Sequence, residues 1–218
     1  MGRVDQAADA GAFGRSPVIP VVTVDDPQRA VGLARALAAG GLTAIEVTLR
    51  TPAALDCLRA IAGANTGLVV GAGTILDPRQ MDEASAAGAR FLVSPGATDR
   101  LIDAARASGF PWLPGAGTAA EAMRLAEAGF THQKFFPAEP SGGVAFLKGV
   151  APVLPGIRFC PTGGVDAKNA SAYLALSNVF TVGGSWVAPA AALAEGNYGL
   201  IERLARDAAS LRVANERG

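Results

Sequence analysis

The sequence Ala44-Ile-Glu-Val-Thr-Leu-Arg50 leads through an alanine-rich segment to Leu68-Val-Val-Gly-Ala-Gly-Thr74. Both of these short runs are rich in apolar and β-branched residues, which is typical of buried strands. Between them, Leu55, Leu58 and Ile61 follow the spacing of one helix face. The stretch therefore predicts a strand, a helix and a second strand. Strands joined in this way run parallel in one sheet.

The same strand–helix pattern recurs along the whole chain. Small residues crowd the end of almost every strand, whereas an open doubly wound sheet concentrates its special glycines at one or two turns. We therefore expect one (β/α)₈ (TIM) barrel over residues 17–218, after a loose lead or short helix over residues 1–16, with the open sheet as the alternative. The eight apolar runs begin about every 23 residues, at Val18, Ala44, Leu68, Phe91, Pro111, His132, Ile157 and Val179.

Four helix starts carry local signals. Asp26-Pro27, Thr51-Pro52 and Asp77-Pro78 each place a capping side chain before a proline, which is favoured at the first position of a helix. Thr118 and Glu121 have the spacing of a capping box, in which each residue satisfies a backbone N–H near the other. We expect helices to begin at these points.

The composition narrows the class of protein. Of 218 residues, 50% are hydrophobic, and 19 basic residues balance 19 acidic ones. Because nucleic acids require a basic surface, we expect no nucleic-acid partner. One histidine and two cysteines, Cys57 and Cys160, suit neither a typical zinc site nor a disulfide framework, so we expect a reduced, cytoplasmic protein without a metal. Residues 170–194 are uncharged but interrupted by polar residues, glycines and Pro189, so we expect no membrane span.

Lys134 lies inside a predicted strand, in His132-Gln-Lys-Phe-Phe-Pro137. Strand alternation puts His132, Lys134 and Phe136 on one face. If that face points into the barrel, burial disfavours the ammonium form and makes a nucleophilic amine available. Such an amine can condense with a ketone to form an imine. The alternative is a lysine that pairs with a carboxylate or extends out of the barrel mouth.

A second strand offers a partner for this lysine. Alternation puts Glu46, Thr48 and Arg50 on one face, opposite an apolar face suited to the helix layer. Glu46 inside the barrel is a candidate general base, and Arg50 at the mouth can bind a substrate carboxylate through two parallel hydrogen bonds. The alternative is an ion pair of Glu46 with Arg50 or Lys134 that only fills the barrel.

Glycines follow the last two strands, in Thr162-Gly163-Gly164 and Gly183-Gly184-Ser185. In this barrel the corresponding loops often bind phosphate through backbone N–H groups, which glycine leaves accessible. The alternative is a pair of tight turns. Gly115-Ala-Gly-Thr-Ala-Ala120 matches a dinucleotide-binding pattern, but we interpret it as a tight turn into a capped helix.

Six motifs remain to be considered together: Glu46–Thr51, Gly71–Thr74, Ser94–Gly96, Lys134–Glu139, Phe159–Gly164 and Gly183–Trp186. Together they resemble the bacterial 2-keto-3-deoxy-6-phosphogluconate (KDPG) aldolases of the Entner–Doudoroff pathway. The resemblance runs from about Pro17 to the C-terminal helix and implies a metal- and cofactor-independent class I aldolase, a (β/α)₈ homotrimer. Its implied reaction cleaves KDPG to pyruvate and glyceraldehyde 3-phosphate, and in many members also 4-hydroxy-2-oxoglutarate to pyruvate and glyoxylate.

The resemblance also implies a role for each site residue. Lys134 would form the imine, and Glu46 would move protons through a water molecule. The groups around the substrate would then have three tasks: to bind the carboxylate, to shape the pocket around the pyruvyl carbons, and to bind the chain and the phosphate of a phosphorylated keto acid. The residues for these tasks are, in that order, Arg50 and Thr74; Pro95 and Phe136; and Thr162, with Gly163, Gly164, Gly184 and Ser185.

Three other functions remain open at this point. An aldolase for the galactonate-derived epimer of KDPG (KDPGal) would use the same groups. A phosphosugar isomerase or epimerase would use the same phosphate site with a carboxylate base, and Lys134 would act only through its charge. A barrel without catalytic activity could bind an anionic metabolite.

Overall fold

The structure is a computed structural model in which residues 11, 13 and 15–211 of the 218 are described. All strand pairs of this part of the chain are parallel. Its strands are β1 (Val18–Val22), β2 (Ala44–Thr48), β3 (Val69–Gly73), β4 (Phe91–Val93), β5 (Trp112–Leu113), β6 (Gly115–Ala116), β7 (His132–Phe135), β8 (Arg158–Pro161) and β9 (Val182–Gly184).

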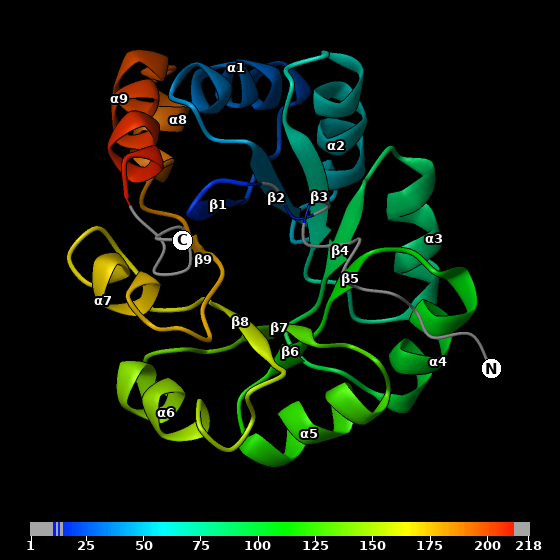
Figure 1. Cartoon of the computed structure of the whole chain (residues 1–218). Helices are drawn as coiled ribbons and strands as arrows, with labels where there is room; N and C mark the ends of the chain where they lie inside the picture. The colour runs from blue at the N-terminus through cyan, green and yellow to red at the C-terminus, as the bar shows by residue number, and fades with distance from the viewer. Residues whose placement is uncertain (1–10, 12, 14, 212–218) are drawn as a thin grey trace.

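The strands form a closed ring (Figure 1). One sheet has the order β5-β4-β3-β2-β1-β9, and a second has the order β6-β7-β8. A bridge between Thr162 and Gly183 joins the two sheets on one side. On the other side, β5 and β6 belong to one predicted run, which Pro114 divides because proline has no N–H to continue the ladder. The predicted barrel is confirmed, and the open sheet is wrong.

Helices surround the ring of strands in Figure 1. Their apolar faces pack against the outer face of the sheets and form the main hydrophobic core with it. They are α1 (Pro27–Ala39), α2 (Ala54–Gly63), α3 (Pro78–Ala86), α4 (Asp99–Ser108), α5 (Ala119–Glu127), α6 (Gly143–Val150), α7 (Ala170–Leu174), α8 (Ala190–Ala194) and α9 (Tyr198–Ala209). None of the helices in the described part of the chain has the length and apolar character needed to cross a membrane.

Three of the four predicted helix starts are confirmed. Asp26 and Asp77 accept backbone N–H groups at the starts of α1 and α3, and Thr118 forms the capping box of α5. The prediction for Thr51 is wrong. Helix α2 begins only at Ala54, and the Thr51 hydroxyl donates instead to the carbonyl of Val24 at 2.6 Å. This hydrogen bond ties the loop after β2 to the end of β1.

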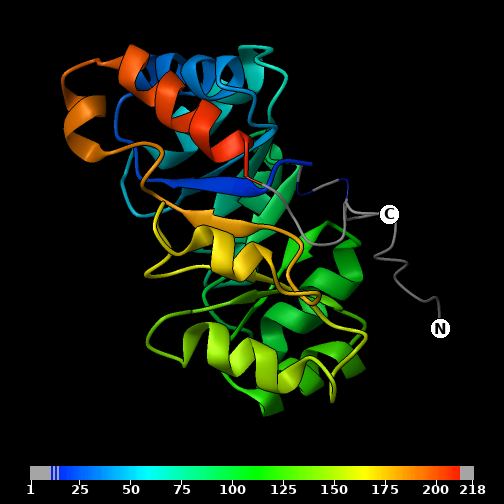
Figure 2. The ribbon, with the colours of Figure 1, turned by 60° about the vertical axis from the view of Figure 1, so that its left-hand side comes forward.

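The N-terminal end of the barrel is filled by side chains (Figure 2 shows the barrel from the side). A second apolar cluster lies inside the ring, and Phe13 belongs to it with 1% of its surface exposed. Its ring meets Phe91 edge-on, at 5.6 Å between centroids. The rings of His132 and Phe180 lie 6.3 and 6.2 Å from it and 5.0 Å from each other, between centroids. Residues 1–10, 12 and 14 of the predicted lead lie outside the described residues.

The two faces of β7 agree with the strand alternation. On β7, the Gln133 amide donates to the carbonyl of Ala122 in α5, and Phe135 stacks on Phe146 of α6 at 4.9 Å. Both side chains therefore point outward to the helices. Lys134, between them in sequence, points into the barrel.

Candidate active site

Lys134 and Glu46 meet inside the barrel. Lys134 Nζ lies 3.2 Å from Glu46 Oε1, although β7 and β2 are 88 residues apart in sequence. Lys134 is 5% exposed and Glu46 is 3% exposed. Gly73 of β3 makes room for this carboxylate, because a Cβ at that position would come within 2.1 Å of Glu46 Oε1. The predicted buried lysine and the predicted carboxylate partner are thus in direct contact.

Of the two buried side chains that could act as a nucleophile here, Lys134 and Cys160, only Lys134 is available. The thiol of Cys160 lies on the neighbouring strand, and burial raises its pKa to about 12, so it stays a protonated thiol near neutral pH. The Phe136 ring lies over the amine, 5.3 Å from Nζ to the ring centroid. An amine with an adjacent carboxylate to accept its proton is suited to attack a carbonyl carbon.

Arg50 and Thr74 form a second pair at the barrel mouth. Arg50 Nε donates to Thr74 Oγ1 at 3.1 Å. Thr74 has a φ of 62°, a left-handed conformation that costs a β-branched residue about 1–3 kcal/mol. Strain of this kind is concentrated at functional sites. The exposed Arg50 is thus held by Thr74 at the mouth, where the sequence predicts a group that binds a carboxylate.

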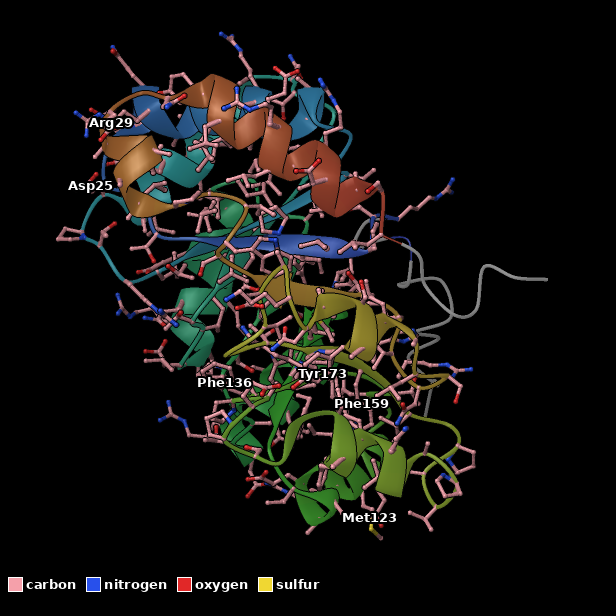
Figure 3. The ribbon with its side chains drawn as sticks, turned by 90° about the vertical axis from the view of Figure 1, so that its left-hand side faces the viewer. Asp25, Arg29, Met123, Phe136, Phe159 and Tyr173 are labelled. Atoms are coloured by element: carbon pink, nitrogen blue, oxygen red, sulfur yellow. The ribbon has the colours of Figure 1, made fainter. Side chains whose placement is uncertain are left out.

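A cavity of about 500 Å³ opens at the carboxyl ends of the strands. Figure 3 shows Phe136 toward the end of the barrel that carries Asp25, with Phe159 further from that end. Pro95 lines a neighbouring cavity of about 280 Å³, which shares Phe136 with the first. Lys134 and Glu46 are buried on strands that end at these cavities. The large cavity is lined by seven of the predicted residues, namely Arg50, Phe136, Thr162, Gly163, Gly164, Gly184 and Ser185.

The glycines of this cavity are required by its shape. Gly163 and Gly164 have φ angles of 98° and 82°, which residues with a side chain rarely adopt. A Cβ on Gly183 would lie 2.2 Å from the Thr162 hydroxyl, and one on Gly184 would lie 1.8 Å from the Trp186 ring. These turns therefore present backbone to the cavity, as a phosphate site requires.

Among the lining residues that were not predicted as site residues, Thr23 and Trp186 have a polar or an aromatic side chain. Thr23 follows β1, and its hydroxyl lies 2.9 Å from that of Thr48. Its position at the end of the first strand was the available signal. Trp186 follows Ser185 directly and packs on Gly184. Its place in the last glycine motif could have identified it.

The turn at Gly115 has a structural role. Glu121 Oε2 accepts the N–H groups of Gly117 and Thr118, at 2.8 and 3.0 Å. These donors are the ones that a dinucleotide would need, so the tight-turn interpretation agrees with the structure. In the part of the chain that is described, no three His, Cys, Asp or Glu side chains lie together as metal ligands would.

Known proteins with a similar sequence identify the family. Residues 11–204 match the family described as KDPG and KHG aldolase, where KHG is 4-hydroxy-2-oxoglutarate. The chain belongs to this family. It is 47% identical over 192 residues to the "KHG/KDPG aldolase" of Escherichia coli K12, covering 88% of this chain and 90% of that protein.

Two solved structures of family members share the fold. The KDPG aldolase of Legionella pneumophila is 43% identical with a TM-score of 0.90, over 92% of this chain and 98% of that one, and holds pyruvate as a covalent carbinolamine intermediate. The enzyme of Zymomonas mobilis ZM4, solved with 3-phosphoglycerate, is 40% identical with a TM-score of 0.90, over 98% of this chain and 99% of that one.

Proposed function

We propose that this aldolase cleaves KDPG to pyruvate and glyceraldehyde 3-phosphate through an imine on Lys134, and that it also cleaves KHG to pyruvate and glyoxylate. The observation that carries the proposal is the buried Lys134–Glu46 pair, 3.2 Å apart, on strands that end at a cavity with an arginine and two glycine turns. The carbinolamine in the Legionella relative supports the same chemistry.

Imine formation begins with proton transfer from the Lys134 ammonium toward Glu46. The neutral amine attacks the C2 carbonyl of the substrate and forms a carbinolamine. Loss of water, with a proton supplied from Glu46 through a water molecule, gives a protonated imine. This cation can accept the electron pair of the C3–C4 bond.

Carbon–carbon cleavage uses the same carboxylate. Glu46, through a water molecule, takes the proton of the C4 hydroxyl. The C3–C4 electron pair moves to C3 and gives an enamine on Lys134, while C4 becomes the aldehyde of the departing product. Protonation of the enamine at C3 and hydrolysis of the imine then release pyruvate and restore the amine. Lys134 thus supplies the electron acceptor, and Glu46 transfers the protons.

The proposed substrate has a carboxylate at one end and a phosphate at the other, and the candidate site offers groups for both. Arg50 and Thr74 bind the carboxylate beside the reacting carbonyl, and Pro95 and Phe136 contact the pyruvyl carbons. Thr162 contacts the substrate chain. The phosphate is bound by backbone N–H groups of Gly163, Gly164, Gly184 and Ser185 and by the Ser185 hydroxyl. The 3-phosphoglycerate in the Zymomonas relative supports a phosphorylated ligand.

The test measures pyruvate release with lactate dehydrogenase and NADH, using KDPG, KDPGal and KHG as separate substrates. We expect turnover of KDPG and KHG, with KDPG preferred to its epimer. A preference for KDPGal would assign the chain to the galactonate series. Absence of pyruvate from all three substrates would reject the proposed function, and interconversion of a phosphosugar without carbon–carbon cleavage would favour the isomerase.

The homotrimer implied by the family resemblance and the cytoplasmic location expected from the composition stay predictions. Light scattering coupled to size-exclusion chromatography measures the mass of the assembly, and a value near three chains is expected. Fractionation of the source cells checks the location.

A further inference from the structure

A tyrosine and a glutamate outside the catalytic pair meet behind the Gly163–Gly164 turn. Tyr173 on α7 is fully buried, and its hydroxyl donates to the Glu139 carboxylate on the loop between β7 and α6. In Figure 3, Tyr173 lies between Phe136 and Phe159. Burial, together with this carboxylate, raises the pKa of Tyr173 well above its usual range, so the phenol keeps its proton and remains the donor. The catalytic steps use neither residue.

The Glu139 side chain packs directly against the turn. A Cβ on Gly164 would lie 2.6 Å from Glu139 Cγ and 2.7 Å from Glu139 Cβ. The methylene groups of Glu139 therefore occupy the space on one side of Gly164. The Asn169 amide also donates to the Gly164 carbonyl at 2.9 Å. Both side chains therefore hold the turn in place.

Backbone hydrogen bonds join the same two loops. Ala138 N–H donates to the Thr162 carbonyl at 2.8 Å, and Glu139 N–H donates to the Gly163 carbonyl at 3.0 Å. Two carbonyl groups of the turn are thus engaged by the loop after β7. A peptide whose carbonyl is fixed on one side has its N–H directed to the other, so these bonds orient the turn as a unit.

The direction of the Glu139 carboxylate matters for an anionic ligand. A carboxylate beside a phosphate would repel it. Glu139 Oε1 instead accepts from Tyr173 and lies 3.2 Å from the place of a Cβ on Gly143, at the start of α6. Among the described residues, those lining the large cavity include Gly163 and Gly164 but not Glu139.

We infer that Tyr173 and Glu139 are positioning residues for the phosphate end of the substrate. Tyr173 holds the carboxylate away from the cavity, and the side chain of Glu139 then fixes the Gly163–Gly164 turn. The inference rests on the proposed function, because it concerns the phosphate of the same substrate. It concerns no group that touches the reacting atoms.

The decisive variant is Tyr173→Phe, which removes one hydroxyl and keeps the ring. A hydrogen bond to a charged group contributes enough for a loss of about tenfold. We expect the KM for KDPG to rise about tenfold. The pyruvate concentration needed for half-maximal borohydride trapping should change less than twofold, because pyruvate carries no phosphate. The control is Tyr198→Phe on α9, where the ring covers Gly32 of α1, and it should change neither value.

Two variants of the exposed Glu139 separate positioning from folding. Glu139→Gln keeps the methylene groups and an oxygen acceptor for Tyr173, and should retain the wild-type KM for KDPG within about threefold. Glu139→Ala loses both and should raise that KM at least as much as Tyr173→Phe. If Tyr173→Phe does not fold, the comparison of Glu139→Gln with Glu139→Ala still tests the positioning role.

The inference would be overturned if Tyr173→Phe raised the KM for KDPG and the pyruvate concentration for half-maximal trapping equally. An unchanged KM for KDPG in Glu139→Ala would also overturn it. If wild-type protein did not cleave KDPG, the proposed function itself would fail. If wild-type protein cleaved KDPG but neither Tyr173→Phe nor Glu139→Ala selectively weakened binding of the phosphorylated substrate, the inference alone would fail.

Discussion

Replacement of Lys134 by methionine should abolish turnover and also destabilise the fold. Methionine fills a similar volume without a nucleophile, so pyruvate release should fall to the background of the assay. The same change leaves the Glu46 carboxylate buried without its partner at 3.2 Å. Removal of one member of a buried ion pair costs about 3–5 kcal/mol. For a chain of this length each kcal/mol lowers Tm by about 2–4 °C, so Tm should fall by about 6–20 °C.

The double variant Lys134→Met/Glu46→Gln separates the two effects. It removes the unpaired charge together with its partner, and replacement of a whole buried pair by neutral groups is often close to neutral in stability. We expect its Tm to return most of the way to the wild-type value while turnover stays absent. The control is Lys148→Met on α6, an exposed position, which should alter neither Tm nor turnover measurably.

Thermal unfolding followed by circular dichroism, together with the coupled pyruvate assay, measures both quantities. Retention of substantial cleavage by Lys134→Met would refute the role of the lysine. A double variant as unstable as Lys134→Met would refute the explanation through an unpaired buried charge.

Three further changes test other parts of the site. Arg50→Lys should raise the pyruvate concentration for half-maximal borohydride trapping about tenfold, because an ammonium cannot form two parallel bonds to a carboxylate; an unchanged value would contradict its role. Ser185→Ala should raise the KM for KDPG about tenfold but leave that for KHG within twofold, and equal effects would count against the phosphate site. Burial, with a smaller effect of Arg158, lowers the pKa of His132 from 6.5. His132 is therefore protonated more readily in the unfolded chain than in the folded one. The free energy of unfolding should fall as the pH falls below about 6.5, and it should fall less in His132→Phe. Urea unfolding at pH 7.5 and 5.5 measures this, and identical losses in both proteins would disprove it.

Local patterns were sufficient for much of the fold. The apolar runs predicted the strands because each strand of a parallel barrel is buried, and the alternation in Glu46, Thr48 and Arg50 predicted which side chains face inward. The capping signals at Asp26 and Asp77 succeeded because a cap is satisfied by the next three residues.

The features that the sequence did not predict depend on contacts between residues distant in sequence. Thr51 has the sequence of a cap, but its hydroxyl bonds to Val24, on a loop that only the folded barrel brings near. The burial of Phe13 depends in the same way on Phe91, which the closed ring places at the N-terminal end.

The sequence suggested the residues of the candidate site but not the contacts between them. The sequence left open whether Glu46 would pair with Arg50 or with Lys134, since strand alternation places all three in the barrel without giving distances. Closure of the ring determines that Glu46 meets Lys134 and that Arg50 meets Thr74 instead. The contact between Tyr173 and Glu139 joins two loops that no local pattern relates.

The most direct test of an imine on Lys134 is borohydride reduction in the presence of pyruvate, followed by peptide mass spectrometry. Reduction of the imine leaves the three carbons of pyruvate bound to the lysine nitrogen through a stable secondary amine. We predict one such adduct per chain, on the peptide that contains Lys134, and none in Lys134→Met. An adduct on Lys148 or Lys168 alone, or unmodified protein that still cleaves KDPG, would contradict it.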